Sequence, residues 1–261
     1  MSSAPHRRTP RRSRKELRRL LVEAGTELLL EEGLGTGAEH LTFKRVFERL
    51  ESTTGVRVTN ASVIGRIWDS QDDFQTELLS TIARDNGIQG LDATLEMIGP
   101  VLAGADRSTP EARLLAVREI CRLGGVANLD AVVSSSGWPP WIGVWALVMA
   151  GTDSEKKRPI EEALREGYGE VTNSYQEVYE AISTHFGLRP RSPLTIHQFT
   201  IAIDAFAQGC ALRDSVDSES VRRILRPTGP CGEDQEWTLF GIGLDALVAE
   251  FLEPDPEWEL G

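Results

Sequence analysis

Hydrophobic residues recur every three or four positions over most of the chain, which is the spacing of helices that bury one face. Ser13 and Glu16 form an S-x-x-E box, typical of a capped helix start, and Gly33 marks the end of the helix that follows. No run alternates apolar and polar residues at the period of a strand, so the predicted fold class is all-α. Further helices are predicted over 91–102, 109–122, 139–149, 155–186, 195–213 and 235–252.

The segment 41–74, LTFKRVFERLESTTGVRVTNASVIGRIWDSQDDF, is the most informative part of the chain. Thr42 can cap an amphipathic helix, residues 52–55 break it, and Thr59 can cap a second, very short helix. This order of helix, connector and short helix predicts a helix-turn-helix, whose second helix enters a DNA groove. The predicted buried face of the short helix consists of Val63, Ile64 and Ile67.

Charge is divided unequally along the chain. The net charge of −12 is unfavourable for a nucleic-acid binder when it is taken alone. Residues 1–68 nevertheless hold 13 Lys/Arg against 8 Asp/Glu, whereas the remaining residues hold 15 against 32. The distribution predicts that a basic N-terminal part meets a polyanion while the acidic remainder does something else. Three well-separated cysteines fit a reduced, cytoplasmic protein without a disulfide framework.

A recognition helix needs small or polar residues at its start, since its backbone approaches the base edges closely. Basic residues around it can neutralise phosphates, and the amide-rich start of the preceding helix also suits a phosphate. The arginine-rich segment 1–12 can reach into a minor groove, although such a segment is by itself more often a solvated tail. The predicted DNA-binding residues are Arg7, Arg8, Arg11, Arg12, Thr42, Lys44, Arg45, Arg57, Thr59, Asn60, Ala61, Ser62 and Arg66.

These parts, in this order, resemble the TetR family of bacterial transcriptional regulators. The resemblance covers 14–83. It lies in the E-x-G end of the first helix, the L-T before the second, and VTNASVIGRIWDSQDDF at the recognition helix and the entry to the next helix. It implies a homodimer on a double-stranded operator with two half-sites, and a variable helical domain whose small-molecule ligand releases the DNA.

The same stretch departs from the family pattern in two ways. The tyrosine that the family often has near Ile64 and its lysine near Gln71 are both missing. The connector between the two helices is also longer, and Trp68 resembles an insertion. Arg57 and Arg66 are hypothesised to replace the lost phosphate contacts. The alternative is a helical ligand-sensing or protein-interaction protein with a degenerate helix-turn-helix and weak DNA binding.

Tryptophans recur at helical spacing in the middle of the chain. Three of them share one side of a predicted helix, with a methionine one turn further. Plain core packing explains such a stripe at least as well as a ligand does. The second interpretation is a pocket for an unidentified small, apolar ligand, with tyrosine hydroxyls from the next long helix. The predicted ligand-binding residues are Trp138, Trp141, Trp145, Met149, Tyr168 and Tyr175.

The two strongly apolar helices predicted near the end of the chain are interpreted as a dimer face. Two such helices from each subunit would form a four-helix bundle about a two-fold axis. Packing within one subunit is nearly as good an account of any single position. The predicted interface residues are Ala202, Ala205, Phe206, Gly209, Leu239, Gly243, Ala246 and Leu247.

Other chemistry is not indicated by the sequence. The four histidines lack metal-ligand spacing, Ser134–Ser136 lack the context of a nucleophile, and no cofactor motif is present. The most apolar stretch, 138–150, is too short to cross a bilayer. We therefore expect no enzyme activity, no metal site, no cofactor and no membrane insertion.

Together these patterns predict three parts. Residues 1–12 form a flexible basic arm, 13–68 a small three-helix DNA-binding head, and 69–261 a larger helical body for ligand binding and dimerisation. The predicted function is a cytoplasmic, ligand-responsive transcriptional repressor that binds operator DNA as a homodimer.

Overall fold

The chain divides into two compact units. The N-terminal unit comprises Met1–Asn86 with Pro139–Arg165, and the C-terminal unit comprises Gly87–Trp138 with Glu166–Gly261. Both are mainly helical, as the sequence predicts, and the domain boundary expected after residue 68 stays a prediction. The structure, a computed structural model, describes residues 12–33, 41–85, 90–151, 155, 157–229 and 232–259.

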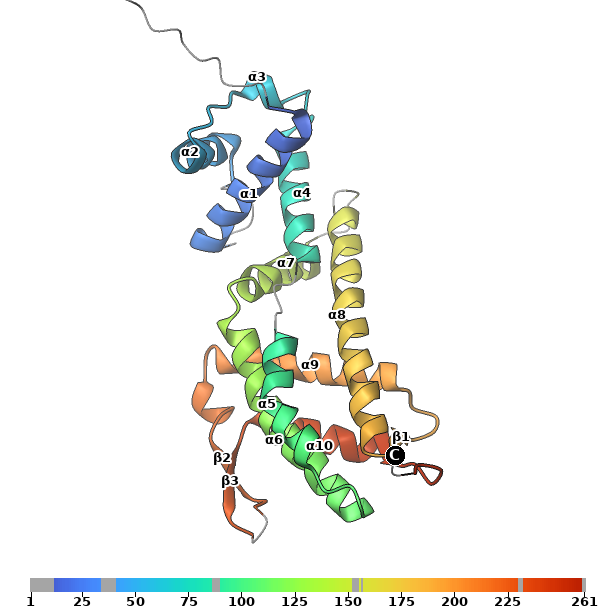
Figure 1. The fold of residues 1–261 in the computed structure, drawn as a ribbon. Helices are drawn as coiled ribbons and strands as arrows, with labels where there is room; N and C mark the ends of the chain where they lie inside the picture. The colour runs from blue at the N-terminus through green and yellow to red at the C-terminus, as the bar shows by residue number, and fades with distance from the viewer. Residues whose placement is uncertain are drawn as a thin grey trace, which may run out of the picture. The chain divides into compact units, whose positions relative to one another are not determined.

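Helices make up most of both units (Figure 1). The N-terminal unit holds α1 (Arg14–Glu32), α2 (Phe43–Thr54), α3 (Asn60–Val63), α4 (Gln71–Arg84) and most of α7 (Trp138–Ala150). The C-terminal unit holds α5 (Gly90–Gly104), α6 (Pro110–Ser134), the later part of α8 (Arg158–His185), α9 (Ile196–Asp214) and α10 (Leu239–Phe251).

Side-chain caps fix where many of these helices begin. The predicted caps Ser13 and Thr42, together with Ser70, Thr109 and Thr195, each accept a hydrogen bond from a backbone amide three residues further on. Each bond satisfies an amide that a helix start leaves without an intrahelical partner, and it is worth about 1 kcal/mol. These helix starts are therefore set by local sequence, and the predictions for them are confirmed.

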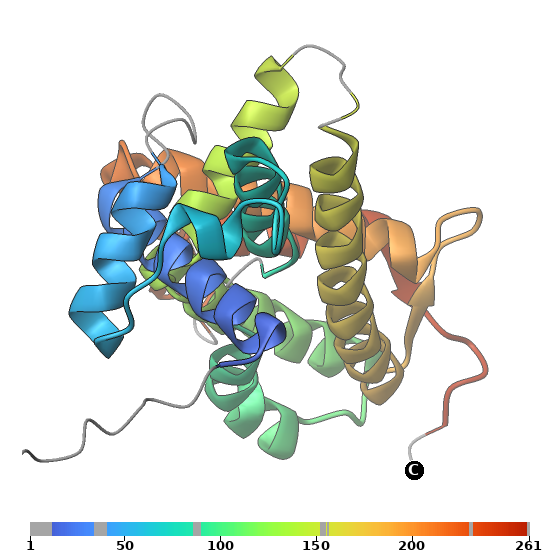
Figure 2. The same cartoon turned by 90° about the horizontal axis from the view of Figure 1, so that it is seen from above.

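The core of the N-terminal unit lies where α1 meets α2 and α4 (Figure 2). Leu21 and Leu78 are fully buried there. Gly25 brings α1 and α4 close together, because a Cβ at this position would lie 3.0 Å from Cζ of Phe74. Within the same unit, the Trp141 indole on α7 donates a hydrogen bond to the carbonyl of Ala83 at 3.3 Å.

An aromatic cluster closes this core beside α3. Trp68 stands edge-on to Phe74 at 4.9 Å between ring centroids and lies 6.1 Å from the ring of Phe43. The side chain interpreted as an insertion is thus a core residue, 5% exposed. The predicted burial of Ile64 is wrong, since this residue is 43% exposed. Helix α3 ends at Val63, so the chain leaves helical geometry before Ile64 can face inward.

In the C-terminal unit, α6 packs against α5, α9 and α10 (Figures 1 and 2). The crossing of α6 and α10 is very close at one point. A Cβ built on Gly125 would lie only 2.5 Å from Cα of Gly241. Only glycine leaves room for such a backbone contact. The helix predicted to end at 122 continues to Ser134, because Gly125 allows the close crossing with α10 and does not break α6.

The described residues are mainly helical, as the all-α prediction expects, but they also include short strands. Two antiparallel pairs occur in the C-terminal unit: β1 (Leu188–Pro190) with β4 (Leu252–Pro254), and β2 (Ile224–Pro227) with β3 (Asp234–Trp237). Each strand has only three or four residues, too few for an alternating pattern to stand out. The helix predicted from residue 235 consequently starts at Leu239, after the strand and the cap Thr238.

Candidate functional site

Four arginines gather around an open groove in the N-terminal unit. Arg12 and Arg14 come from the start of α1, while Arg57 and Arg66 come from the segments before and after α3. Among the residues that the structure describes, no acidic side chain lines this space. We call it the arginine groove. Its lining residues are Arg12, Ser13, Arg14, Leu17, Thr54, Gly55, Val56, Arg57, Val58, Ser62, Gly65, Arg66 and Ile67.

The four arginines differ in whether they form ion pairs with neighbouring carboxylates. Arg12 lies 3.4 Å from Glu16, and Arg57 donates a hydrogen bond to Glu51 at 2.6 Å. Such exposed ion pairs are weak, so a polyanion can compete with them. Arg14 and Arg66 are exposed and form no ion pair with any residue that the structure describes. These two guanidinium groups are available to an anion without breaking an existing contact.

The start of α3 faces outward beside this groove. Thr59, Asn60 and Ala61 are exposed, as a base-reading role requires. The Ser62 hydroxyl is already used locally, because it accepts from the amide of Thr59 at 3.2 Å and donates to the carbonyl of Thr59 at 2.6 Å. The helix has only four residues, Asn60–Val63, so it offers less than two turns to a partner.

The other predicted DNA-binding residues lie outside the arginine groove. Thr42 caps α2, exposed Lys44 is 4.0 Å from Glu48, and Arg45 pairs with Glu32. The positions of Arg7, Arg8 and Arg11 lie outside the residues that the structure describes. The structure therefore brings together Arg12, Arg57, Ser62 and Arg66 from the predicted set. It adds Arg14, which sequence reasoning missed because this residue was treated only as part of a helix start.

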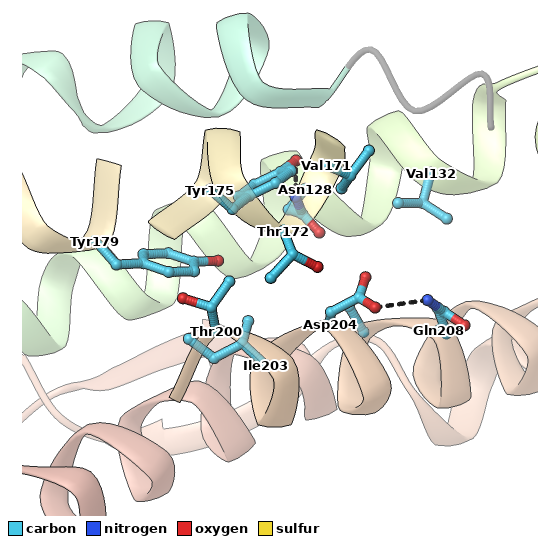
Figure 3. A pocket seen from close by; sticks show the side chains of 11 residues that line it. Asn128, Val132, Val171, Thr172, Tyr175, Tyr179, Thr200, Ile203, Asp204 and Gln208 are labelled. Carbon is cyan, nitrogen blue, oxygen red and sulfur yellow. Dashed lines mark hydrogen bonds between the residues drawn. The ribbon is translucent and has the colours of Figure 1, made fainter. Parts of the chain in front are cut away.

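A narrow cavity opens in the C-terminal unit between α6, α8 and α9 (Figure 3). Its enclosed volume is small, about 30 Å³, which is room for one or two water molecules, and it is partly open to solvent. We call it the tyrosine cavity. It is lined by Asn128, Val132, Val171, Thr172, Tyr175, Tyr179, Thr200, Ile203, Asp204, Ala207 and Gln208.

Hydrogen bonds hold the polar groups of this cavity in place. The Asn128 amide donates to the Tyr175 hydroxyl at 2.8 Å, and the Gln208 amide donates to the Asp204 carboxylate at 2.8 Å. Burial raises the pKa of Asp204 above its ordinary value, and the bond from Gln208 opposes this rise only in part. Burial also raises the pKa of Tyr175 to about 12, so its hydroxyl stays protonated at neutral pH.

Of the six predicted ligand-binding residues, only Tyr175 lines the tyrosine cavity. Tyr168 does not line the cavity, but its hydroxyl donates a hydrogen bond to Oε1 of the lining residue Gln208 at 2.9 Å. The tryptophan stripe lies elsewhere: Trp138 and Trp141 are buried, and Met149 is 74% exposed. Asn128 on α6 and Thr200 and Asp204 on α9 were missed, since isolated polar residues on two apolar helices share no sequence motif.

The predicted dimer residues fall into two groups. Ala205, Gly209, Leu239 and Ala246 are exposed on the surface of α9 and α10. Ala202, Phe206, Gly243 and Leu247 are half-buried. A Cβ at Gly243 would lie 1.9 Å from Cε1 of Phe206, so this pair packs α9 against α10 within one chain. Two further exposed apolar residues on α9 are Ile201 and Leu212, and Val216, just after the end of this helix, is exposed as well.

The described residues contain neither a metal-binding cluster nor a membrane-spanning helix. No group of three or more His, Cys, Asp or Glu side chains in that part of the chain is arranged to hold a metal ion. Among the same residues, none of the helices combines the length and the apolar character needed to cross a bilayer.

Comparison with known proteins gives a distant structural likeness. No protein-family model matches the chain, and no curated protein matches it. Among solved structures, the chain is similar to "The crystal structure of the putative transcriptional regulator from Pseudomonas aeruginosa PAO1". The identity is 15%, the TM-score is 0.45, and 92% of each chain is covered. A likeness at this level assigns no function to the chain.

Proposed function

We propose that the protein is a cytoplasmic transcriptional regulator of TetR-like organisation, which binds double-stranded operator DNA as a homodimer and releases it when a small molecule binds. The observation that carries the proposal is the arginine groove. Four arginines from three separate segments converge there with no carboxylate among the lining residues, although the chain as a whole is acidic.

The electrostatics of the groove suit a phosphate backbone. Lysine and arginine side chains that neutralise phosphates release counterions from DNA, which is the main source of sequence-independent affinity. The exposed Thr59, Asn60 and Ala61 at the start of α3 are short enough for a close approach to base edges. The proposal therefore assigns phosphate contacts to the arginines and base contacts to the start of α3.

Selection from a random duplex library, followed by fluorescence anisotropy across salt concentrations, tests this assignment. We expect a sequence-selective complex whose affinity falls steeply with salt. Arg14→Ala and Arg66→Ala should each weaken binding to all sequences and lower the salt slope by about 1. Asn60→Ala should instead relax specificity at one base position.

Arg165→Ala is the matched control, because this exposed arginine on α8 lies outside the groove. It should leave affinity and salt slope unchanged. If the wild-type protein forms no complex at about 50 mM salt, or if Arg66→Ala leaves the slope intact, the regulator proposal is rejected.

The homodimer part of the proposal draws on the exposed side of α9. Ile201, Ala205, Gly209 and Leu212 follow one another at spacings of three or four, so they form a single apolar stripe along that helix. A second copy of the same stripe about a two-fold axis would cover it with an apolar surface of equal length.

A second candidate function is favoured by the head itself. Helix α3 has only four residues, and Arg45 and Arg57 already form ion pairs with Glu32 and Glu51. Both features weaken a DNA interface. They favour a helical ligand-sensing or interaction protein, which would form no selective DNA complex in the experiment above.

A further inference from the structure

Asp204 on α9 is the one acidic side chain among the described residues that line the tyrosine cavity, and none of them is basic. It forms no ion pair with any residue that the structure describes. A mostly buried carboxylate without a counter-cation is costly when it is ionised, because burial disfavours its charged form. The surroundings of Asp204 therefore favour its protonated form.

Only one of the two carboxyl oxygens of Asp204 has a hydrogen-bond partner among the described residues. The amide of Gln208 donates to Oδ2 at 2.8 Å. The Tyr168 hydroxyl donates to Oε1 of Gln208 and so fixes the direction in which that amide points. The other carboxyl oxygen, Oδ1, accepts no hydrogen bond from a described residue. The carboxyl group is therefore oriented, and Oδ1 is the oxygen that can hold a proton.

A hydroxyl group from α8 faces the same cavity. Thr172 is only 8% exposed, and its hydroxyl has no hydrogen-bond partner among the described residues. Figure 3 shows the Thr172 hydroxyl and the Asp204 carboxyl group pointing into the same space from α8 and α9. A space of about 30 Å³ has room for one or two water molecules, which can bridge polar groups that do not touch. A protonated carboxyl group can donate across this space to a hydroxyl oxygen, whereas an ionised one can only accept.

We propose that Asp204 is a proton-controlled switch of the packing between α8 and α9. In the protonated state its carboxyl group donates toward Thr172, directly or through one water molecule, and the two helices stay packed. In the ionised state the unpaired charge draws further water into the cavity, and α8 loosens from α9. The switch goes beyond the proposed regulator, because it rests on the cavity alone and holds whether or not the protein binds DNA.

The other titratable groups around the cavity do not change charge in the same pH range. Burial raises the pKa values of Tyr175 and Tyr179, the titratable groups that α8 contributes, so both hydroxyls stay protonated. The side chains that α6 contributes, an amide and a valine, do not titrate. Burial also raises the pKa of the Cys121 thiol on α6, which is close enough to affect Tyr179. On α9, His197 does not line the cavity. A transition of this cavity between pH 4 and 8 therefore reports on Asp204.

Amide hydrogen exchange of the purified full chain, without DNA, tests the proposal. Exchange is expressed as protection relative to the unfolded chain at the same pH, so the chemical effect of pH on exchange cancels. We expect protection over residues 168–182 of α8 to fall by at least about threefold between pH 4 and pH 8. Asp204→Asn places an amide donor where the proton is held and can still accept from Gln208. Its protection at pH 8 should stay within about twofold of the wild-type value at pH 4.

Glu177→Gln is the matched control, because it removes an exposed carboxylate from the same helix outside the cavity. This variant should show the same fall in protection as the wild-type protein. Equal wild-type protection at pH 4 and pH 8 overturns the proposal. So does a fall of the wild-type size in Asp204→Asn, because the effect of pH would then come from other groups.

Gln208→Leu provides a second test if Asp204→Asn fails to fold. It removes the hydrogen bond that favours the ionised carboxylate, so Asp204 should keep its proton to a higher pH. The midpoint of the fall in protection should therefore move to higher pH. An unchanged midpoint in the folded Gln208→Leu protein contradicts the role of Asp204. Because no DNA is present, failure here leaves the regulator proposal standing, and failure of DNA binding leaves this one standing.

Discussion

The indole Nε1 of Trp68 donates a 2.6 Å hydrogen bond to Oε2 of Glu77. The same carboxylate accepts two further bonds from the Arg18 guanidinium, at 2.7 and 2.6 Å. Glu77 on α4 thereby joins α1 to the segment that follows α3. The position of α3 in the N-terminal unit thus depends on a polar contact as well as on the aromatic cluster.

Glu77→Ala should destabilise the protein by about 1–2 kcal/mol, because Trp68 and Arg18 both lose their acceptor. Urea unfolding followed by tryptophan fluorescence measures the change. Glu23→Ala is the control, since its pair with Arg19 is an exposed contact one helical turn apart and should cost less than about 0.5 kcal/mol. Equal losses in the two variants would show that Glu77 plays no special part.

Trp68→Ala should cost roughly 3–5 kcal/mol of unfolding free energy, because a large buried ring is replaced by a cavity against Phe74 and Phe43. Trp68→Phe keeps an aromatic ring at that place and loses only the bond to Glu77 and part of the volume. The free energy of unfolding of Trp68→Phe should lie well between the values for wild type and Trp68→Ala in a denaturation series. A negligible loss in Trp68→Ala would contradict the assigned core position.

Asp204 and Asp214 should make the free energy of unfolding depend on pH in opposite directions. Burial raises the pKa of Asp204, so the folded protein binds its proton more tightly than the unfolded chain, and stability falls as pH rises above about 4. Asp204→Asn removes that fall. It should be more stable than wild type at pH 7, by roughly 1 kcal/mol, and this gain should vanish near pH 4.

The hydrogen bond from Arg222 holds the pKa of Asp214 below its ordinary value. The stability that this bond provides is therefore present above about pH 4 and is lost as pH falls through the lowered pKa. Asp214→Asn should destabilise the protein by about 1–3 kcal/mol at pH 7, with the loss fading in acid. Thermal unfolding of both variants between pH 3 and 7 checks the two signs, and parallel profiles would refute the assignment.

Adjacent glycines on α6 should differ sharply in their tolerance of alanine. Gly125→Ala should destabilise by about 1–3 kcal/mol, because its Cβ would lie 2.5 Å from the α10 backbone at Gly241. At Gly124 the nearest atom would be 3.4 Å away, an ordinary contact with Ile98. Gly124→Ala should be neutral or stabilising by up to about 1 kcal/mol. Calorimetric unfolding of the pair provides the test.

The proposed dimer predicts an effect of charge on the apolar stripe of α9. Ala205→Arg places a charge in the middle of the stripe and should convert a dimer into a folded monomer in sedimentation analysis, because an unpaired buried charge is costly. Asn173→Arg, an exposed position on α8, adds the same charge away from the stripe and should leave the dimer intact. A wild-type monomer would exclude the dimer altogether.

How much of this could be predicted from sequence depends on the range of the interaction involved. Capping is local, so the helix starts after Ser13, Thr42 and Thr195 follow from a few neighbouring residues. The outward face of Ile64 could not be predicted. It depends on α3 ending at Val63. Beyond this point Trp68 and its aromatic neighbours fill the core, where the helical spacing had predicted Ile64.

The arginine groove and the tyrosine cavity also differ in how far they could be predicted from the sequence. Arg57 and Arg66 could be singled out because basic residues near a short helix form a recognisable pattern. The tyrosine cavity could not, since Asp204, Asn128 and Tyr175 are distant in sequence and meet only when three helices pack together. The tryptophan stripe illustrates the converse: its regular spacing reflects a packed helix, and the side chains of Trp138 and Trp141 are buried and do not line that cavity.

The backbone contact between Gly125 and Gly241 has a consequence for the ancestry of this chain. A Cβ on Gly125 would lie 2.5 Å from Cα of Gly241, and a Cβ on Gly241 would lie 3.0 Å from the carbonyl oxygen of Cys121, so a side chain at either position would push α6 and α10 apart. Distant relatives that keep this crossing should retain both glycines after most other residues have changed. The pair offers a two-residue signature by which homologues of the C-terminal unit can be recognised beyond the reach of overall identity.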